Sequence, residues 1–241
     1  MHRLRDLVRF YDLLDRLSQQ IGGPRQLAES SGRHRWPERG VYFFFEPGEM
    51  RLDSGTGPRV VRVGTHAVTE QSRTTLWNRL SQHRGNAGSK GGNHRGSVFR
   101  KLVGAALQAK AAAPAVQSWG HKQDARQAAL SLGLSLEMLQ AEEHPVEVAV
   151  SQYIGRMPFL WVAVLDMSGA GSDRSTIECG AISLLSNWNR PSLDSPSETW
   201  LGLLSDRDRV SGSGLWNVQH VAEYHDPAFL QLLEERIHAT R

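Results

Sequence analysis

The sequence has a single cysteine, Cys179, among its 241 residues. One cysteine excludes an internal disulfide framework and any metal knuckle that needs several thiolates. Long apolar runs are also missing. The longest, residues 159–165, falls well short of the ~20 residues that a membrane-spanning helix needs, and it suits a buried strand. The first residues are charged at once and lack the apolar core of a signal peptide. We expect a protein with no membrane segment that works in a reducing cytoplasm.

Acidic residues are missing from one long window. No Asp or Glu occurs between Gln71 and Gln123, although the chain has 25 acidic residues in all. The window holds nine of the 28 lysines and arginines, so the rest of the chain has 19 positive and 25 negative charges, a net charge of −6. A local excess of positive charge among glycines favours binding to a phosphate-rich polyanion. A solvated basic face is the alternative.

What remains is the composition of an ordered globular protein, with 39% hydrophobic and 22% charged residues. Apolar residues at three- and four-residue steps predict a helix over residues 3–21, and Pro24 is expected to open a short second helix. β-Branched and aromatic residues predict three strands, the first two as a hairpin, over residues 41–45, 59–63 and 159–165. Further helices are expected over 74–84, 98–113, parts of 126–154 with a boundary near Pro145, 175–185 and 227–238. The fold class is therefore α+β, a small sheet of about three strands flanked by helices.

Particular residues stand on the hairpin and on the helix after it. The first strand opens with Gly40-Val41-Tyr42, and the second ends in Arg62-Val63-Gly64. On the following helix Arg79 and His83 are four residues apart, so they share one face. This ordered set resembles the GIY-YIG nuclease family, whose members carry Gly-Ile-Tyr on one strand and Tyr-Ile-Gly on the next. An Arg follows on a helix, often with a His one turn later in restriction-type members.

The resemblance covers about residues 40–190 and implies a division of the chain. Residues 1–35 form a helical N-terminal extension, and 36–200 form a GIY-YIG-like core with a helical insertion at about 86–155. Residues 201–241 form a helical C-terminal extension. The function implied is a metal-dependent endonuclease that hydrolyses DNA phosphodiester bonds. The alternative is a non-catalytic nucleic-acid-binding protein on the same fold, and a homodimer is left open.

The family's remaining site residues lie on a later helix and beyond it. The resemblance assigns its metal-binding Glu to Glu178 and its downstream Asn to Asn189, with Asn187 as a close rival. Mg²⁺ or Mn²⁺ suits this site, because a hard cation binds phosphate oxygens and needs only one or two protein carboxylates. The structural alternative for Glu178 is a carboxylate that favours the dipole near a helix N-terminus.

Three more residues have a chemical role and a plain alternative. Tyr42 would orient or deprotonate the attacking water; otherwise it is a core aromatic. Arg79 would clamp phosphate with its permanently charged, bidentate guanidinium; otherwise it is a solvated helix arginine. His83 would relay a proton or bind phosphate; otherwise it is an ordinary surface histidine.

Arg62 is the departure from the family pattern, since it stands where the second motif has Tyr. Either Arg62 points at phosphate and substitutes electrostatically for the missing hydroxyl, or it points to solvent on an edge strand. Its charge would favour the phenolate of a nearby Tyr42. Arg62 therefore joins the predicted catalytic residues.

The glycine- and arginine-rich segment after the Arg helix is expected to follow the DNA backbone. Its predicted DNA-binding residues are Arg84, Lys90, Arg95, Arg100 and Lys101. Cys179 has no His partner at a recognisable spacing, and a small buried residue is expected there. His220 and His225 match no zinc motif spacing.

Overall fold

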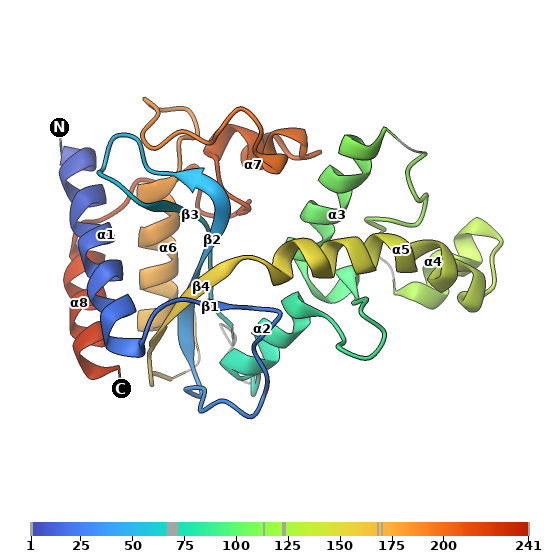
Figure 1. Ribbon diagram of the computed structural model, residues 1–241, viewed down its shortest axis with the longest axis horizontal. Helices are drawn as coiled ribbons and strands as arrows, with labels where there is room; N and C mark the ends of the chain where they lie inside the picture. Colours follow the sequence, from blue (N-terminus) through green and yellow to red (C-terminus); the bar gives the residue numbers. More distant parts are fainter. Residues whose placement is uncertain are drawn as a thin grey trace.

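The computed structural model describes residues 2–66, 72–112, 114–121, 124–167, 169 and 171–240. Gln71, Lys122 and Gln123 of the acid-free window lie outside these residues. The α+β fold predicted from the sequence is confirmed, with helices packed on both sides of a small sheet (Figure 1).

Three of the strands match the prediction. β2 (Gly40–Met50) and β3 (Pro58–Gly64) form the antiparallel hairpin, and β4 (Pro158–Ala163) pairs antiparallel with the other edge of β2. A fourth strand of two residues, β1 (Arg25–Gln26), completes the order β1-β4-β2-β3. The helix expected after Pro24 is wrong, because the chain there pairs with β4 instead of coiling.

The α-helices account for most of the remaining structure. Their bounds are α1 His2–Ile21, α2 Leu76–Arg84, α3 Val98–Ala111, α4 Ala125–Leu132, α5 Leu136–Gly155, α6 Asp173–Leu185, α7 Asp208–Ser213 and α8 Ala228–Ala239. Two 3₁₀ turns, η1 (His94–Gly96) and η2 (Leu201–Leu204), lie before α3 and α7.

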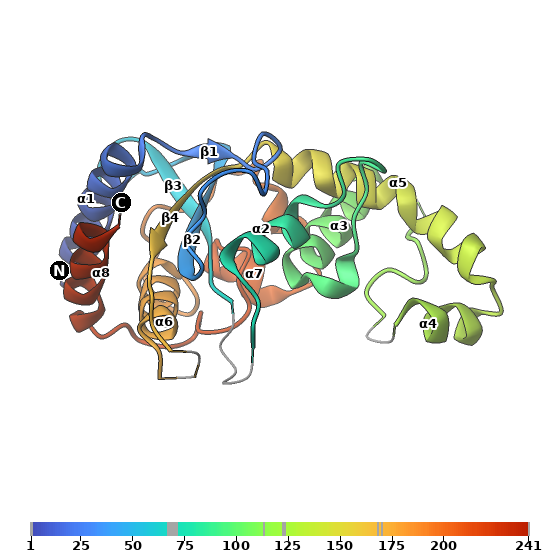
Figure 2. The ribbon, with the colours of Figure 1, turned by 90° about the horizontal axis from the view of Figure 1, so that it is seen from below.

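Alternate residues of β2 face two separate cores, as the two-residue period of a strand requires. Val41, Phe43 and Phe45 pack with α1, α6 and α8. Tyr42 and Phe44 point the other way and pack with α2, α3 and α5. Figures 1 and 2 show the same division, with α1 beside α8 on one side of the sheet and α4 at the far end of the other side.

Pro145 lies inside α5, so the helix boundary expected near it is wrong. Ser135 caps the start of this helix by accepting a hydrogen bond from the Met138 N–H at 3.2 Å. Glu143 and Glu147, on either side of the proline, are buried. The burial of these residues shows that this part of α5 packs against the rest of the protein. Such tertiary packing commonly overrides the low helix propensity of a proline.

Candidate functional site

A pocket of about 240 Å³ opens where β2 and β3 meet α6 and the segment after α7. The residues that line it come from six parts of the chain: Tyr42, Arg62, Thr65, Arg79, Val98, Glu178, Ile182, Asn217, Val218, Gln219 and His220. Four of the predicted site residues are therefore brought together, and His83 adjoins one of them.

Tyr42 is fully buried and its hydroxyl faces His83. The Tyr42 Oη lies 2.8 Å from His83 Nε2, and His83 Nδ1 lies 2.8 Å from Ser97 Oγ. Burial and the positive charges of Arg79 and Arg62 hold the pKa of His83 well below its usual value. His83 is therefore a neutral, buried partner of Tyr42 and not the surface histidine of the alternative.

The hairpin register explains why glycine ends the second strand. Tyr42 lies opposite Gly64 across the β2–β3 ladder. A Cβ atom at position 64 would collide with the phenol ring of Tyr42. The glycine thus makes room for the tyrosine in the pocket.

Arg62 points into the protein, so the alternative of a solvent-exposed side chain is wrong. It is buried, its guanidinium donates to the backbone oxygen of Trp216, and it lies 4.6 Å from the centre of the Phe99 ring. Burial lowers its pKa, while Tyr42 and Glu178 nearby act in the opposite direction. The positive charge of Arg62 therefore interacts with both the phenol and the carboxylate of the pocket.

Arg79 lies half-buried at the rim of the pocket. Thr75 caps α2 by accepting from the Asn78 N–H at 3.2 Å, which starts the helix that carries this arginine. The Arg79 guanidinium donates to Gln82 Oε1 at 3.0 Å and to the Gly96 backbone oxygen at 3.2 Å. Both of these hydrogen-bond partners are neutral, and the charge of Arg79 acts on the carboxylate of Glu178 in the same pocket.

Glu178 supplies the carboxylate of the pocket. Its Oε1 accepts from the Thr65 N–H at 3.1 Å, and Oε2, which no described residue binds, is left for a ligand. Burial raises the pKa of this carboxyl, and Arg62 opposes the rise. A hard divalent cation fits here, because such an ion takes oxygen ligands, keeps several waters and needs few carboxylates.

Asn189 is not brought to the pocket, and an asparagine from further along the chain lines it. Asn189 is exposed in the loop after α6, and Asn187 holds that loop by accepting from the Leu193 N–H at 2.9 Å. Asn217 lines the pocket instead. Its side chain binds both backbone groups of Val63, at 3.2 and 2.9 Å, so it covers the outer edge of β3.

The predicted DNA-binding residues mostly bind other parts of the protein. Arg100 is fully buried and paired with Glu147, and Arg95 makes two 2.7 Å hydrogen bonds to Glu143. Both acids lie on α5, outside the acid-free window. Assigning Arg100 to the DNA surface is therefore wrong, because α5 neutralises the window from within.

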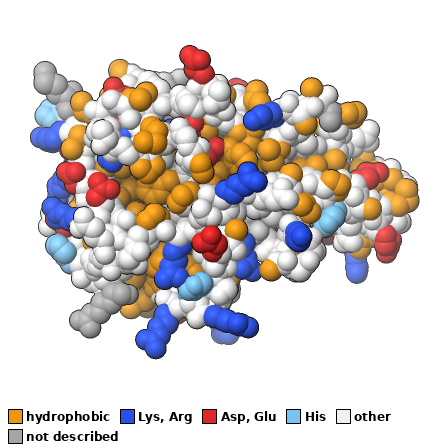
Figure 3. All heavy atoms as spheres, in the orientation of Figure 1, with side chains coloured by type: hydrophobic (Ala, Val, Ile, Leu, Met, Phe, Trp, Pro, Cys, Tyr) orange, Lys and Arg blue, Asp and Glu red, His pale blue; other side chains and the backbone are white. Residues whose placement is uncertain are grey.

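Of the other three predicted DNA-binding residues, two bind backbone oxygens of the protein and one is exposed. Arg84 donates to the backbone oxygen of Ser30, and Lys101 donates to that of Gly120 at 2.6 Å. Lys90 is exposed. Figure 3 views the molecule from the same side as Figure 1. Lys and Arg side chains gather at its lower edge, where Figure 1 has α2 and the loop before β2.

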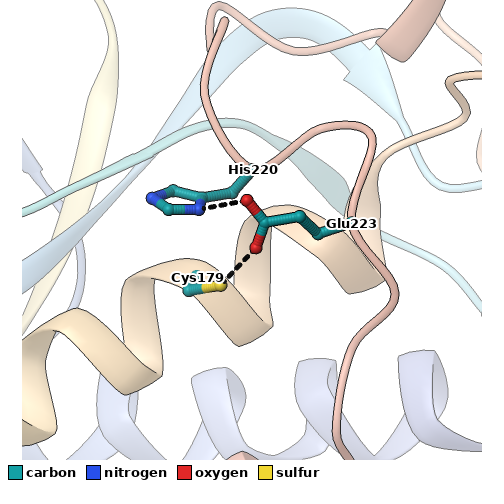
Figure 4. Close-up of side chains that lie close together, drawn as sticks. All are labelled: Cys179, His220 and Glu223. Carbon is teal, nitrogen blue, oxygen red and sulfur yellow. Dashed lines mark hydrogen bonds and ion pairs between the residues drawn. The ribbon is translucent and has the colours of Figure 1, made fainter. Parts of the chain in front are cut away.

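A cluster beside the pocket has no counterpart among the sequence motifs. Cys179 on α6 lies against Glu223, and Glu223 also binds His220 (Figure 4). Cys179 is half-buried and not the buried residue expected from the sequence, and His220 lies near it because the chain returns to α6 about forty residues later. No spacing rule detects a cluster whose members come from such separate segments.

Comparison with known proteins identifies one matching family. A family model described as the GIY-YIG domain matches residues 1–241. No curated protein and no solved structure matches the chain significantly. Among the described residues, no helix combines the length and apolarity needed to cross a bilayer. The family model spans the whole chain, and the tyrosine, helix arginine and glutamate that the resemblance assigned lie in one pocket, so the protein belongs to the GIY-YIG nuclease family.

Proposed function

We propose that this protein is an endonuclease that hydrolyses phosphodiester bonds of DNA in the Tyr42–Glu178 pocket, with Mg²⁺ or Mn²⁺. The observation that carries the proposal is the meeting of Tyr42, Arg62, Arg79 and Glu178 in one pocket of about 240 Å³. Cleavage needs an oriented water, neutralisation of charge on the transferring phosphoryl group, and help for the leaving oxygen. These four side chains supply groups for each need.

Tyr42 would orient the attacking water. Because His83 is neutral, its Nε2 can accept a hydrogen bond from the phenol O–H while its Nδ1–H donates one to Ser97 Oγ. The lone pairs of the Tyr42 oxygen are then available to accept a hydrogen bond from water. The adjacent Arg62 charge favours negative charge on that oxygen during the reaction.

The two arginines would bind the phosphate. Arg79 at the rim has a charged fork and only neutral hydrogen-bond partners in the described structure, so it can bind two phosphate oxygens. Arg62 is held more deeply by Trp216 and supplies a fixed charge. Charge that is fixed in advance in a partly dry pocket stabilises a transition state more than a mobile charge does.

Glu178 would hold the divalent ion through its free oxygen. When bound there, the ion would polarise a phosphate oxygen and offset the charge that develops on the leaving side. Thr65 orients the carboxylate by donating its N–H to the other oxygen. Burying the charged carboxylate without a cation costs free energy, and a bound cation would offset that cost.

The DNA backbone would approach from the end of the sheet where β2 begins. Arg33, Arg35 and Arg73 are exposed on the segments that precede β2 and α2. Tyr42 lies near the start of β2, and Arg73 lies three residues before α2, the helix that carries Arg79. Exposed arginines of this kind would position phosphates without reading sequence.

A plasmid-nicking assay tests the proposal. The wild-type protein should nick supercoiled DNA with Mg²⁺ or Mn²⁺ and stop when EDTA is added. Glu178→Gln should lose cleavage yet keep its DNA affinity by fluorescence anisotropy. The matched control Glu235→Gln, at an exposed site on α8, should behave as wild type. Salt-sensitive DNA binding without any cleavage would instead favour the non-catalytic binding protein.

A further inference from the structure

Three side chains with metal-binding atoms lie together beside the pocket (Figure 4). Cys179 extends from α6, and His220 and Glu223 come from the segment between α7 and α8. The Cys179 Sγ lies 3.1 Å from Glu223 Oε2, and His220 Nδ1 lies 2.8 Å from Glu223 Oε1. One atom from each residue lies within 4.8 Å of the others.

The three donors suit a different cation from the one that Glu178 would hold. Thiolate, imidazole and carboxylate are zinc ligands, whereas Mg²⁺ binds oxygen only. Tetrahedral zinc with bonds of about 2.0–2.3 Å sets its ligand atoms roughly 3.3–3.8 Å apart. The donor atoms lie within 4.8 Å of one another, so their separations would change by at most about 1.5 Å to admit the ion.

We infer that Cys179, His220 and Glu223 form a second metal site, specific for zinc and similar divalent ions. Cys179 binds as a thiolate, so its S–H bond breaks and one proton leaves to solvent. His220 binds through Nδ1 and carries its proton on Nε2. Three protein ligands leave a fourth position for water.

The ion would connect two parts of the pocket wall. His220 lines the pocket, and so do Asn217, Val218 and Gln219 just before it in the chain. Cys179 follows Glu178 directly on α6. Zinc at this site therefore ties the helix that carries Glu178 to the segment that carries Asn217, and it fixes the width of the pocket between them.

Cobalt spectroscopy tests the site without DNA and without cleavage, so its outcome is independent of the proposed nuclease activity. Titration of the full-length protein with Co²⁺ should produce a thiolate-to-metal charge-transfer band that saturates at one equivalent. Zn²⁺ should displace the cobalt and remove the band. A wild-type protein that shows no thiolate band overturns the inference.

Variants identify the ligands. Cys179→Ser should abolish the band, and His220→Asn and Glu223→Gln should each weaken Co²⁺ binding by about tenfold or more, since even outer-shell losses cost about 10- to 100-fold. Glu178→Gln should keep the band, which separates this site from the proposed Mg²⁺ site. His144→Asn and Glu235→Gln, both at exposed positions, serve as controls. Unchanged affinity in His220→Asn and Glu223→Gln overturns the assignment.

A measurement on the unaltered chain covers the case in which a variant fails to fold. Excess Zn²⁺ should protect Cys179 from alkylation and raise the melting temperature by about 5 °C or more at a hundredfold excess over Kd. Mg²⁺ at the same concentration should protect poorly. Equal alkylation rates with and without Zn²⁺ contradict the site.

Discussion

The hydroxyl of Tyr42 and Nε2 of His83 are 2.8 Å apart, and both side chains are fully buried. A buried phenol needs a hydrogen-bond partner, and a buried imidazole needs two. His83 meets both needs, since Ser97 Oγ lies 2.8 Å from its other nitrogen. The orientation of the Tyr42 hydroxyl is thus set by α2 and α3 before any substrate binds.

Tyr42→Phe should lower the single-turnover cleavage rate by a factor of about 10²–10⁴, the usual contribution of a positioned acid–base group. The ring remains to fill the core, so DNA affinity should change little. Tyr224→Phe is the matched control, because Tyr224 is an exposed tyrosine outside the pocket. A Tyr42→Phe protein that cleaves as fast as wild type would remove Tyr42 from the reaction.

Arg62→Ala should lower turnover by a factor on the order of 10² or more, because the pocket loses a fixed charge beside Tyr42. It should also lower the melting temperature, since the Trp216 backbone oxygen loses its donor. Arg62→Tyr, which restores the family residue, should recover part of the activity. Arg126→Ala, at an exposed site on α4, is the control. Normal cleavage by Arg62→Ala would mean that this arginine is only structural.

Glu178→Gln should make the metal-free protein more stable at neutral pH while it abolishes cleavage. Burial raises the pKa of Glu178, so the folded state binds more protons than the unfolded state above the ordinary glutamate pKa. Wild-type stability therefore falls as pH rises from the unfolded-state pKa to the folded-state pKa, by about 1.4 kcal/mol for each pH unit between them. Thermal melts in EDTA from pH 4 to 8 measure the difference. If the melting temperatures of the two proteins changed with pH in the same way, the predicted contribution of Glu178 would be contradicted.

Regular elements were predictable because each buries one periodic face. The helix expected over 3–21 is α1, and the strands expected over 41–45 and 59–63 lie within β2 and β3. The short helix α7 escaped prediction, because six residues are too few to show a period. The two-residue strand β1 exists only through its pairing with β4.

The sequence predicts those site residues that lie close to one another along the chain. Tyr42, Arg62 and Arg79 lie on one hairpin and the helix after it, so motif order alone places them together. Asn217 reaches the pocket only because the chain returns along the edge of β3, which no local pattern reveals. The charge pattern predicted too many DNA-binding residues for a similar reason. The acids that pair with Arg95 and Arg100 lie on α5, which is outside the acid-free window in sequence but packs against it in space.

Cys179 should react slowly with iodoacetamide at pH 8 in EDTA. Burial and the neighbouring Glu223 raise the pKa of this thiol to about 11, so little thiolate is present. Glu223→Gln removes the negative charge and should speed alkylation by about threefold for each pH unit by which the thiol pKa falls, because lower nucleophilicity offsets part of the gain. Glu235→Gln should leave the rate unchanged. Equal rates in the two variants would mean that Glu223 does not control the thiol.

The last prediction separates structural from DNA-binding charges in the acid-free window. Arg100 is fully buried, and its guanidinium binds Glu147 and the His83 backbone oxygen. Arg100→Ala would leave Glu147 as a buried charge without its arginine partner, so we expect a loss of about 3–5 kcal/mol in the free energy of unfolding. Lys90→Ala, at an exposed position, should change that energy by no more than about 0.5 kcal/mol. Urea unfolding of the two variants gives both values.

DNA binding should show the opposite order under conditions in which both variants are folded. Each phosphate contact that is lost lowers the slope of log affinity against log salt by about 0.9. Arg100 cannot reach DNA from its buried position, so Arg100→Ala should keep the wild-type slope. Arg33→Ala and Arg35→Ala, at exposed positions before β2, should each lower it. If Arg100→Ala were stable and lowered the slope, its pairing with Glu147 would have to open for DNA. The acid-free window would then regain the role that its charge first suggested.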